Sequence, residues 1–134
     1  VQDSIHGLKS YEEVSAKTMR LDQFCTSNKI NYIDLLKIDV EGFESIVLEG
    51  AHSLIVSKKI KVIQVEYGKA NLFSRYFIHD YFNDYSEHYV IGKLFPKGVI
   101  WFESYSTELD DLLGPNLIMV LKNEINLIKN LSLN

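Results

Sequence analysis

The sequence predicts an α/β fold whose sheet begins with parallel strands and ends with antiparallel ones. A nearly continuous apolar run at residues 33–40 is typical of a parallel strand that is covered on both faces. An amphipathic helix pattern follows directly and leads to a second apolar run at 62–67, which makes a strand–helix–strand unit. The turn signal Pro96-Lys97-Gly98 then separates two more apolar runs and indicates an antiparallel hairpin.

The elements before the first apolar strand are short. Residues 1–15 are polar and indicate no element, and a short strand is expected over 17–21. Asp22 is expected to cap a helix that runs through Ser27, because aspartate accepts hydrogen bonds from the free N–H groups of a first turn. Asn28 would end this helix, since asparagine tolerates left-handed backbone.

A helix is expected to start near Phe43, directly after the first apolar strand. Its apolar positions recur at helical spacing and are Phe43, Ile46, Val47, Gly50 and Leu54. Glycine is unfavourable in the middle of a helix. We therefore expect Gly50 to allow this helix to pack closely on the sheet.

The second half of the chain is rich in aromatic residues. Residues 72–85 are expected to form a helix with an aromatic face, which either packs into the core or stacks on a ligand; the core is favoured. The elements expected after it are hairpin strands at 89–95 and 99–102, a short helix at 109–113, a strand at 116–121 and a marginal helix to residue 134.

Composition excludes several classes of protein. A chain of 134 residues is one domain or part of one. The net charge of −4 argues against nucleic acid as a partner, and no apolar run approaches the ~20 residues of a membrane span. The single cysteine, Cys25, excludes an intrachain disulfide and favours a reducing compartment, so a cytoplasmic protein is expected.

One stretch carries a resemblance to a known family. It reads Ile-Asp-Leu-Leu-Lys-Ile-Asp-Val-Glu-Gly from Ile33 to Gly42, and continues with Glu44 and with Val-Leu-Glu-Gly-Ala at 47–51. With flanking blocks on both sides, this stretch resembles the FkbM family of S-adenosylmethionine-dependent methyltransferases. The likeness covers residues 21–68 and, more loosely, 89–96 and 116–120.

The resemblance implies an activity and an architecture. The activity is S-adenosylmethionine-dependent O-methyl transfer to a hydroxyl of a sugar, glycan or secondary metabolite, so a small-molecule or glycan acceptor is the expected partner. The fold would be the C-terminal part of a Rossmann-like class I methyltransferase sheet. The family's opening strand and glycine-rich cofactor loop have no counterpart here, because the seven glycines are scattered.

Residues 1–134 are therefore expected to be the C-terminal portion of a single methyltransferase domain. Alone, this portion would be inactive, and its first strand would be left as an apolar sheet edge that favours a homo-oligomer. The alternative function is a non-catalytic half-domain that acts as an oligomerisation or scaffold module.

Acids end both predicted parallel strands, Asp39 the first and Glu66 the second. Neighbouring strand ends lie ~5 Å apart, where open α/β sheets bind their ligands. Asp39 and Glu66 are the catalytic candidates, because a hydroxyl needs a general base or a metal to lose its proton. One acid could hold the cofactor's amino group while the other acts as the base. Two carboxylates could instead share a cation, but the sequence shows no third ligand, so no metal site is expected.

Asp39, Glu41 and Gly42 are the candidates for cofactor binding, since they directly follow the first strand. Glu41 has an equally good structural explanation, because acids suit the start of a helix. Lys37 and Tyr67 are the candidates for the substrate cleft. Lys37 shares a strand face with Asp39 and is expected to pair with an acid, while Tyr67 could line the cleft or pack in the core.

Overall fold

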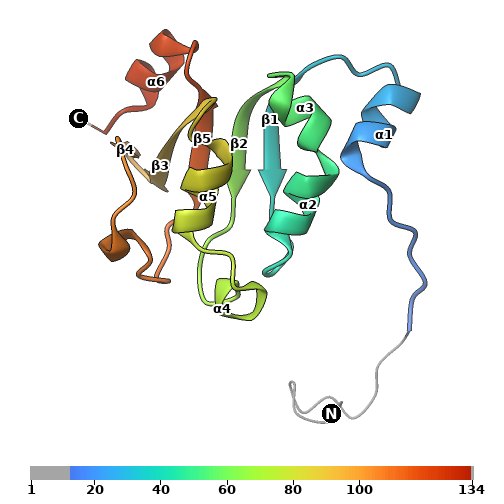
Figure 1. The fold of residues 1–134 in the computed structure, drawn as a ribbon, viewed down its shortest axis with the longest axis horizontal. Coiled ribbons are helices and arrows are strands. Elements are labelled where there is room, and N and C mark those ends of the chain that lie inside the picture. The colour runs from blue at the N-terminus through green and yellow to red at the C-terminus, as the bar shows by residue number, and fades with distance from the viewer. Residues whose placement is uncertain (1–12, 134) are drawn as a thin grey trace.

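The computed structural model describes residues 13–133, which form an α/β fold around one five-stranded mixed sheet (Figure 1). Its strand order is β1-β2-β5-β3-β4. Only β1 and β2 are parallel, and every other neighbouring pair is antiparallel, so the expected mixed sheet is confirmed. The strands are β1 (Ile33–Ile38), β2 (Ile60–Val65), β3 (Tyr89–Phe95), β4 (Gly98–Phe102) and β5 (Leu117–Leu121).

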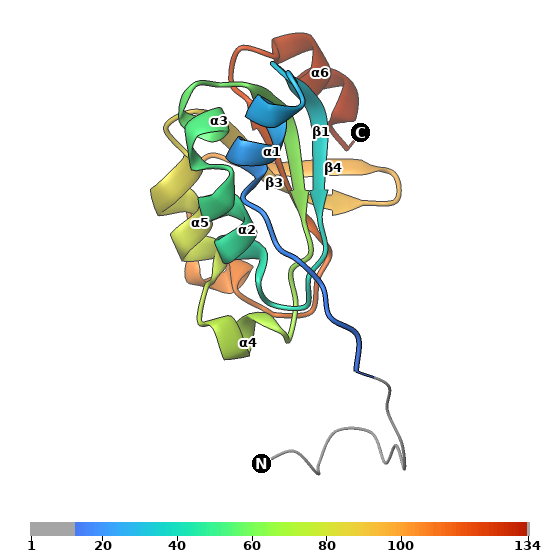
Figure 2. The ribbon, with the colours of Figure 1, turned by 90° about the vertical axis from the view of Figure 1, so that its right-hand side faces the viewer.

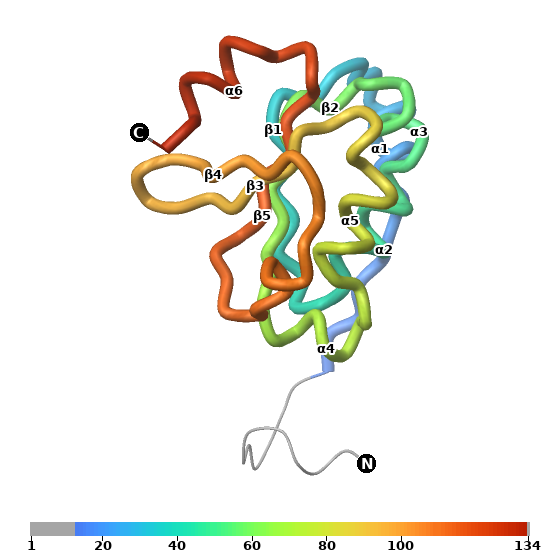
Figure 3. The backbone as a smooth tube through the Cα atoms, turned by 60° about the vertical axis from the view of Figure 1, so that its left-hand side comes forward, coloured from blue at the N-terminus to red at the C-terminus, as the bar shows by residue number. Residues whose placement is uncertain are grey.

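Helices lie on both faces of the sheet, but unequally. In Figure 2 the sheet is seen nearly edge-on, with α1, α2, α3 and α5 on one side and α6 on the other; Figure 3 shows the same division. None of the helices in residues 13–133 is long and apolar enough to cross a membrane. The helices are α1 (Leu21–Ser27), α2 (Glu44–Gly50), α3 (His52–Val56), α4 (Asn71–Ser74), α5 (Ile78–Tyr85) and α6 (Ile125–Leu131).

Two hydrophobic cores lie on the two faces of the sheet. The larger one lies under α2, α3 and α5 and includes the fully buried Leu48, Ile63 and Tyr81. The smaller one contains Val62 and Val120 and is covered by α6. Every residue of β5 is buried, as its central place requires. Since burying one such side chain contributes about 1.5–3 kcal/mol, these cores dominate stability. Tyr81 and Phe82 confirm that the later part of the aromatic segment packs into the core, whereas Phe73 is 89% exposed and does not.

Strand β1 is an edge strand in residues 13–133. Its sequence predicts coverage on both faces, but the side chain of Leu35 is 57% exposed. The strand also ends at Ile38, two residues earlier than expected, because a tight turn follows. The prediction of full coverage is therefore wrong for the described part, while the predicted apolar edge is present.

The helix expected after the first strand is divided in two. α2 ends at Gly50, and α3 begins at His52. A Cβ at Gly50 would lie 3.8 Å from the Cα of Arg20 and 3.7 Å from the backbone nitrogen of Leu21. These are ordinary van der Waals distances to the chain entering α1, and no strand atom is among the contacts, so the predicted close packing of Gly50 on the sheet is wrong.

The region around α1 also differs from its prediction. No strand forms over residues 17–20, and Arg20, not Asp22, is the N-cap of α1. The carboxylate of Asp22 instead accepts hydrogen bonds from the backbone N–H groups of Ser53 and Leu54, both at 3.4 Å. This acid therefore links α1 to α3.

Two turns were not visible in the sequence. The aromatic segment is interrupted by Arg75, whose φ of 55° is left-handed, so that α4 and α5 are separate helices. The helix expected at 109–113 is replaced by a single 3-10 turn at Thr107–Leu109, because Leu112 also has a left-handed φ of 56°. The hairpin and the last strand form as predicted, and a helix follows them, although α6 ends at Leu131, earlier than expected.

Candidate functional site

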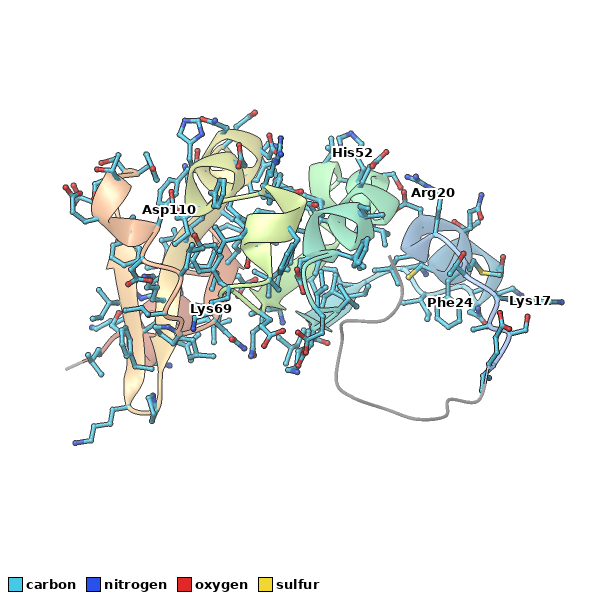
Figure 4. The ribbon with its side chains drawn as sticks, turned by 90° about the horizontal axis from the view of Figure 1, so that it is seen from below. Lys17, Arg20, Phe24, His52, Lys69 and Asp110 are labelled. Atoms are coloured by element: carbon cyan, nitrogen blue, oxygen red, sulfur yellow. The ribbon has the colours of Figure 1, made fainter. Side chains whose placement is uncertain are left out.

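A pocket of about 390 Å³ opens at the carboxyl ends of β1 and β2. Both strands point to this edge of the sheet in Figure 1, and Figure 4 shows the molecule from the same end with the pocket residue Lys69 labelled. Three loops line it: the β1–α2 loop with the first residue of α2, the segment from β2 into α4, and the loop that precedes β5. The lining residues are Glu41, Gly42 and Glu44; residues 66–71; and Leu112, Leu113 and Gly114.

The first loop is a tight left-handed turn. Glu41 has a φ of 54° and Gly42 a φ of 99°. A Cβ at Gly42 would lie 2.9 Å from the carbonyl oxygen of Ala70, so only glycine fits between the first and second loops. The carboxylate of Glu44, which is 2% exposed, accepts hydrogen bonds from the N–H groups of Val40 at 3.0 Å and Gly42 at 3.3 Å.

The second loop is held by the buried Asn71. Its Oδ1 accepts a hydrogen bond from the N–H of Gly68 at 2.9 Å, and its Nδ2 donates one to the carbonyl of Tyr76 at 3.0 Å. Tyr67 lies in this loop and is 2% exposed. Burial and the hydrogen bond to Asp110 raise the pKa of Tyr67, so its hydroxyl stays protonated.

The third loop is held by a charge pair. Lys93, on β3 and 5% exposed, donates a hydrogen bond from Nζ to the carboxylate of Asp111 at 2.9 Å. That contact lowers the pKa of Asp111. The other carboxylate oxygen of Asp111 accepts the N–H of Leu113 at 3.1 Å. The buried ammonium thus fixes the turn that brings Leu113 to the pocket.

Asp110, next to this pair, joins three parts of the fold. Its Oδ1 accepts the hydroxyl of Tyr67 at 2.6 Å and the backbone N–H of Ile78 at 2.7 Å, and its Oδ2 accepts the hydroxyl of Tyr105 at 2.8 Å. Figure 4 labels Asp110 close to α5. The second loop, the start of α5 and the third loop are therefore tied together.

Three carboxylates meet at the mouth of the two parallel strands. Asp39, Glu41 and Glu66 each offer an oxygen, and these oxygens all lie within 4.8 Å of one another. The Nζ of Lys37 donates a hydrogen bond to Asp39 at 2.6 Å. The expected lysine–acid pair is confirmed, although both side chains are about half exposed and not buried.

The two strand-end acids have opposite electrostatics. The hydrogen bond and charge of Lys37 lower the pKa of Asp39. Partial burial, followed by the negative charges of Asp39 and Glu41, raises the pKa of Glu66. The Oε2 of Glu66 is covered and has no hydrogen-bond partner among the described residues. Asp39 therefore stays ionised, whereas Glu66 is the stronger base of the two.

The structure adds Glu41 to the two acids at the strand ends. The left-handed turn directs its carboxylate to within 4.8 Å of those of Asp39 and Glu66, which supplies the third oxygen ligand that the sequence did not show. Such a set suits a hard divalent cation or a cationic group of a ligand.

Sequence reasoning missed four residues that shape the pocket: Glu44, Asn71, Lys93 and Asp110. Lys93 had a signal, since it is a charged residue inside an otherwise apolar strand. Glu44 belongs to the stretch that resembles the family, but its burial had no signal, because it lies outside the apolar helix stripe. Asp110 could not be found without knowing which distant segments meet.

The carboxyl ends of parallel strands are where open α/β sheets bind their ligands, and here a pocket with acids at its rim lies at that place. Residues 2–91, or 90 of 134, match the family model described as Methyltransferase FkbM domain, and the chain belongs to this family. The match includes β1, β2 and all three acids. No curated protein and no solved structure matches the chain.

Proposed function

We propose that this chain takes part in S-adenosylmethionine-dependent O-methyl transfer to a hydroxyl of a sugar, glycan or secondary metabolite. The observation that carries this proposal is the acid cluster, in which neighbouring carboxylates have pKa values shifted in opposite directions. Pairs of acids shifted apart in this way are typical of sites that divide charge stabilisation and proton transfer between two residues.

Glu66 is the proposed general base. S-adenosylmethionine, when bound, supplies a methyl group on a positively charged sulfur. That methyl group would be the electrophile for the acceptor hydroxyl, and a carboxylate of the protein would take the hydroxyl proton. Glu66 suits this step because its raised pKa makes it a better base and its Oε2 has no competing partner among the described residues.

Asp39, Glu41 and Gly42 are the proposed cofactor residues of this chain. The Asp39 carboxylate, kept ionised by Lys37, and the exposed carboxylate of Glu41 complement the positive amino group and sulfonium of the cofactor. Gly42 lets the first loop lie close to the backbone of Ala70 in the second loop, because it has no side chain. The donor set thus fits the cofactor's charge, while a glycine-rich loop for its other parts is not found in the sequence.

The acceptor is proposed to lie between the acids and the third loop. A pocket of about 390 Å³ is within the ordinary range for small ligands. Leu112 and Leu113 add apolar side chains to its lining. The exposed ammonium of Lys37 can donate to an acceptor oxygen, and Tyr67 shapes the wall.

We also propose that the five strands are the C-terminal part of a Rossmann-like class I methyltransferase sheet, with residues 1–134 as the C-terminal portion of one domain. The change from parallel to antiparallel pairing and the outer edge of β1, which has no neighbouring strand in residues 13–133, support this assignment.

Methyl transfer itself is the test. The natural protein should be incubated with methyl-labelled S-adenosylmethionine and a panel of sugars, glycans and secondary-metabolite alcohols, beside amines and nucleic acid. We expect label on a hydroxyl, and expect it to be lost in Glu66→Gln and kept in the control Glu49→Gln, which changes an exposed acid of α2. Label on amines alone, or equal labelling by Glu66→Gln, would overturn the proposal.

The alternative, a non-catalytic oligomerisation module, is favoured by one observation, the exposed Leu35 on β1, which is an edge strand among residues 13–133. It predicts a stable oligomer and no labelled acceptor in the same experiment. Labelling of any hydroxyl acceptor would exclude it.

A further inference from the structure

The described part of the chain buries three polar or charged side chains, Glu44, Asn71 and Lys93. Burying such a group is unfavourable unless its hydrogen bonds are satisfied. Each of the three makes at least one hydrogen bond to a different loop of the pocket. Each loop of the pocket therefore has one buried polar side chain bound to it.

We propose that Glu44, Asn71 and Lys93 are the positioning residues of the pocket, each fixing one of its three walls. The expected effect on methyl transfer rests on the proposed function, whereas the hydrogen bonds that fix the walls do not depend on that function. None of the three is assigned to the chemistry.

Glu44 fixes the wall that carries the acids. Its buried carboxylate binds the N–H groups of Val40 and Gly42, on both sides of the left-handed Glu41. A residue with a positive φ is held only where its surroundings determine it. The place of the Glu41 carboxylate beside Glu66 therefore depends on Glu44.

Asn71 and Lys93 fix the other two walls in the same manner. Asn71 closes the second loop by accepting the N–H of Gly68, two residues after Glu66. Lys93 fixes Asp111, which in turn accepts the N–H of Leu113. Removing Lys93 should therefore disturb the apolar wall without moving the acids.

Amide hydrogen exchange of the full chain, read by two-dimensional NMR, tests the first wall directly. Glu44→Ala should speed exchange of the Val40 and Gly42 amides ~10-fold or more, because their acceptor is gone. The amide of Met119, in the buried β5, should be unchanged. Glu44→Gln should restore protection, since its amide oxygen can accept both hydrogen bonds.

Two outcomes overturn the proposal for this wall. One is unchanged exchange at Val40 and Gly42 in Glu44→Ala, and the other is equal acceleration at Met119, which would indicate general loss of stability. Should Glu44→Ala fail to fold, Glu44→Gln decides, because loss of protection at the two amides in that folded variant would contradict an acceptor role.

Lys93→Met keeps the aliphatic stem and removes the ammonium, and tests the third wall. We expect ~10-fold faster exchange of the Leu113 amide with the Gly42 amide unchanged. Lys93→Arg is the matched control and should preserve protection. If the Gly42 and Leu113 amides respond alike, or Leu113 does not respond, the walls are not separately held and the inference fails.

Kinetics separate this inference from the proposed function. In an active protein, Glu44→Ala should lower kcat for methyl transfer, while Lys93→Met should raise the KM for the acceptor with little change in kcat. Absence of all methyl transfer, with the exchange results as expected, would refute the proposed function and leave the positioning roles standing. Normal exchange in the variants, with methyl transfer intact, would refute the positioning roles and leave the proposed function standing.

Discussion

Asp39 and Glu66 occupy equivalent positions at the ends of neighbouring strands, and yet their environments differ. Lys37 supplies a positive charge to Asp39 alone, since its side chain lies on the same face of β1 two residues earlier. Glu66 is more covered, and the neighbouring charges that raise its pKa are those of Asp39, Glu41 and Glu44, all negative. The division of roles between them follows from this single lysine and from their difference in burial.

Glu66→Gln should lower the turnover of methyl transfer ~10²-fold or more, the usual scale for a lost acid–base group. Asp39→Asn should instead raise the KM for S-adenosylmethionine more than it lowers kcat, because Asp39 supplies charge and not proton transfer. Steady-state kinetics of both variants make the comparison. Equal turnover of Glu66→Gln and the parent would assign the base elsewhere.

Glu66→Gln should also change how the stability of the fold depends on pH. Because the pKa of Glu66 is raised in the folded state, the folded state binds its proton more tightly than the unfolded one, and the stabilisation is lost as pH rises through the folded-state pKa. Glu66→Gln removes the charge that is unfavourable above that pKa. Thermal melts at about pH 8 should therefore show the variant to be at least as stable as the parent.

The pH dependence of kcat/KM should reveal the influence of Glu41. The acid limb should lie above 4.5, the ordinary pKa of glutamate, because Glu66 must lose its proton to act as a base. Glu41→Gln removes one negative neighbour, lowers the pKa of Glu66 and should move the limb to lower pH. The exposed Glu49→Gln is the control and should leave the profile in place; a limb that moves upward would contradict the assignment.

The sequence was sufficient to predict the positions of the two acids that directly follow the parallel strands. It predicted that Asp39 and Glu66 would meet, because parallel strands align their ends. It could not show that Glu41 would join them, since that depends on a left-handed turn held by the buried Glu44.

At the scale of elements, the walls of the pocket depend on segments that are distant in sequence. Asp110 connects the segment after β2, the start of α5 and the turn before β5 through three hydrogen bonds. α5 has only eight residues, so it is not stable alone and depends on such contacts.

Asp110→Ala should destabilise the fold by ~3 kcal/mol, since it removes three hydrogen bonds to a charged group and leaves the buried Tyr67 hydroxyl without an acceptor. For a domain of this size that is a fall in melting temperature of roughly 10 °C. Thermal unfolding followed by circular dichroism measures it. Glu103→Ala, which changes an exposed acid in the same region, should melt with the parent; a similar fall there would show that the effect is not specific.

Element types were predictable where hydrophobic patterning is strong. The five strands and the hairpin turn follow from apolar runs and from Pro96-Lys97-Gly98. The breaks at Ala51 and Arg75 were not predictable, because the apolar spacing continues across both and only the packing of the separate helices decides where the chain turns. Left-handed arginine has no sequence signature.

For the molecule as a whole, the two edges of the sheet differ. The β4 edge is partly paired with the chain's own C-terminal segment, through a bridge between Val99 and Ser132 and a hydrogen bond from the N–H of Leu133 to the carbonyl of Val99. β1 has no such cover in residues 13–133 and exposes Leu35. Open apolar edges favour pairing with another chain.

The chain should therefore self-associate through β1. Light scattering of the purified chain should give a mass above that of one copy, and Leu35→Lys should reduce it, because charge on an edge strand opposes pairing. Ile100→Lys, at an exposed position of the other edge strand, is the matched control and should have no effect. A monomeric parent, or an equal response to both substitutions, would refute association through this edge.

The position of β5 also affects the order in which the protein can be built. β5 is the last strand in the chain, but it lies between β2 and β3 and is buried throughout. During synthesis the pair β1–β2 and the hairpin β3–β4 can each form as they emerge, but nothing joins them until residues 117–121 have left the ribosome. Until that moment the inner edges of β2 and β3 remain unpaired in the nascent chain. Unpaired apolar edges are prone to aggregation, so we expect the need for chaperones to be greatest before β5 is synthesised.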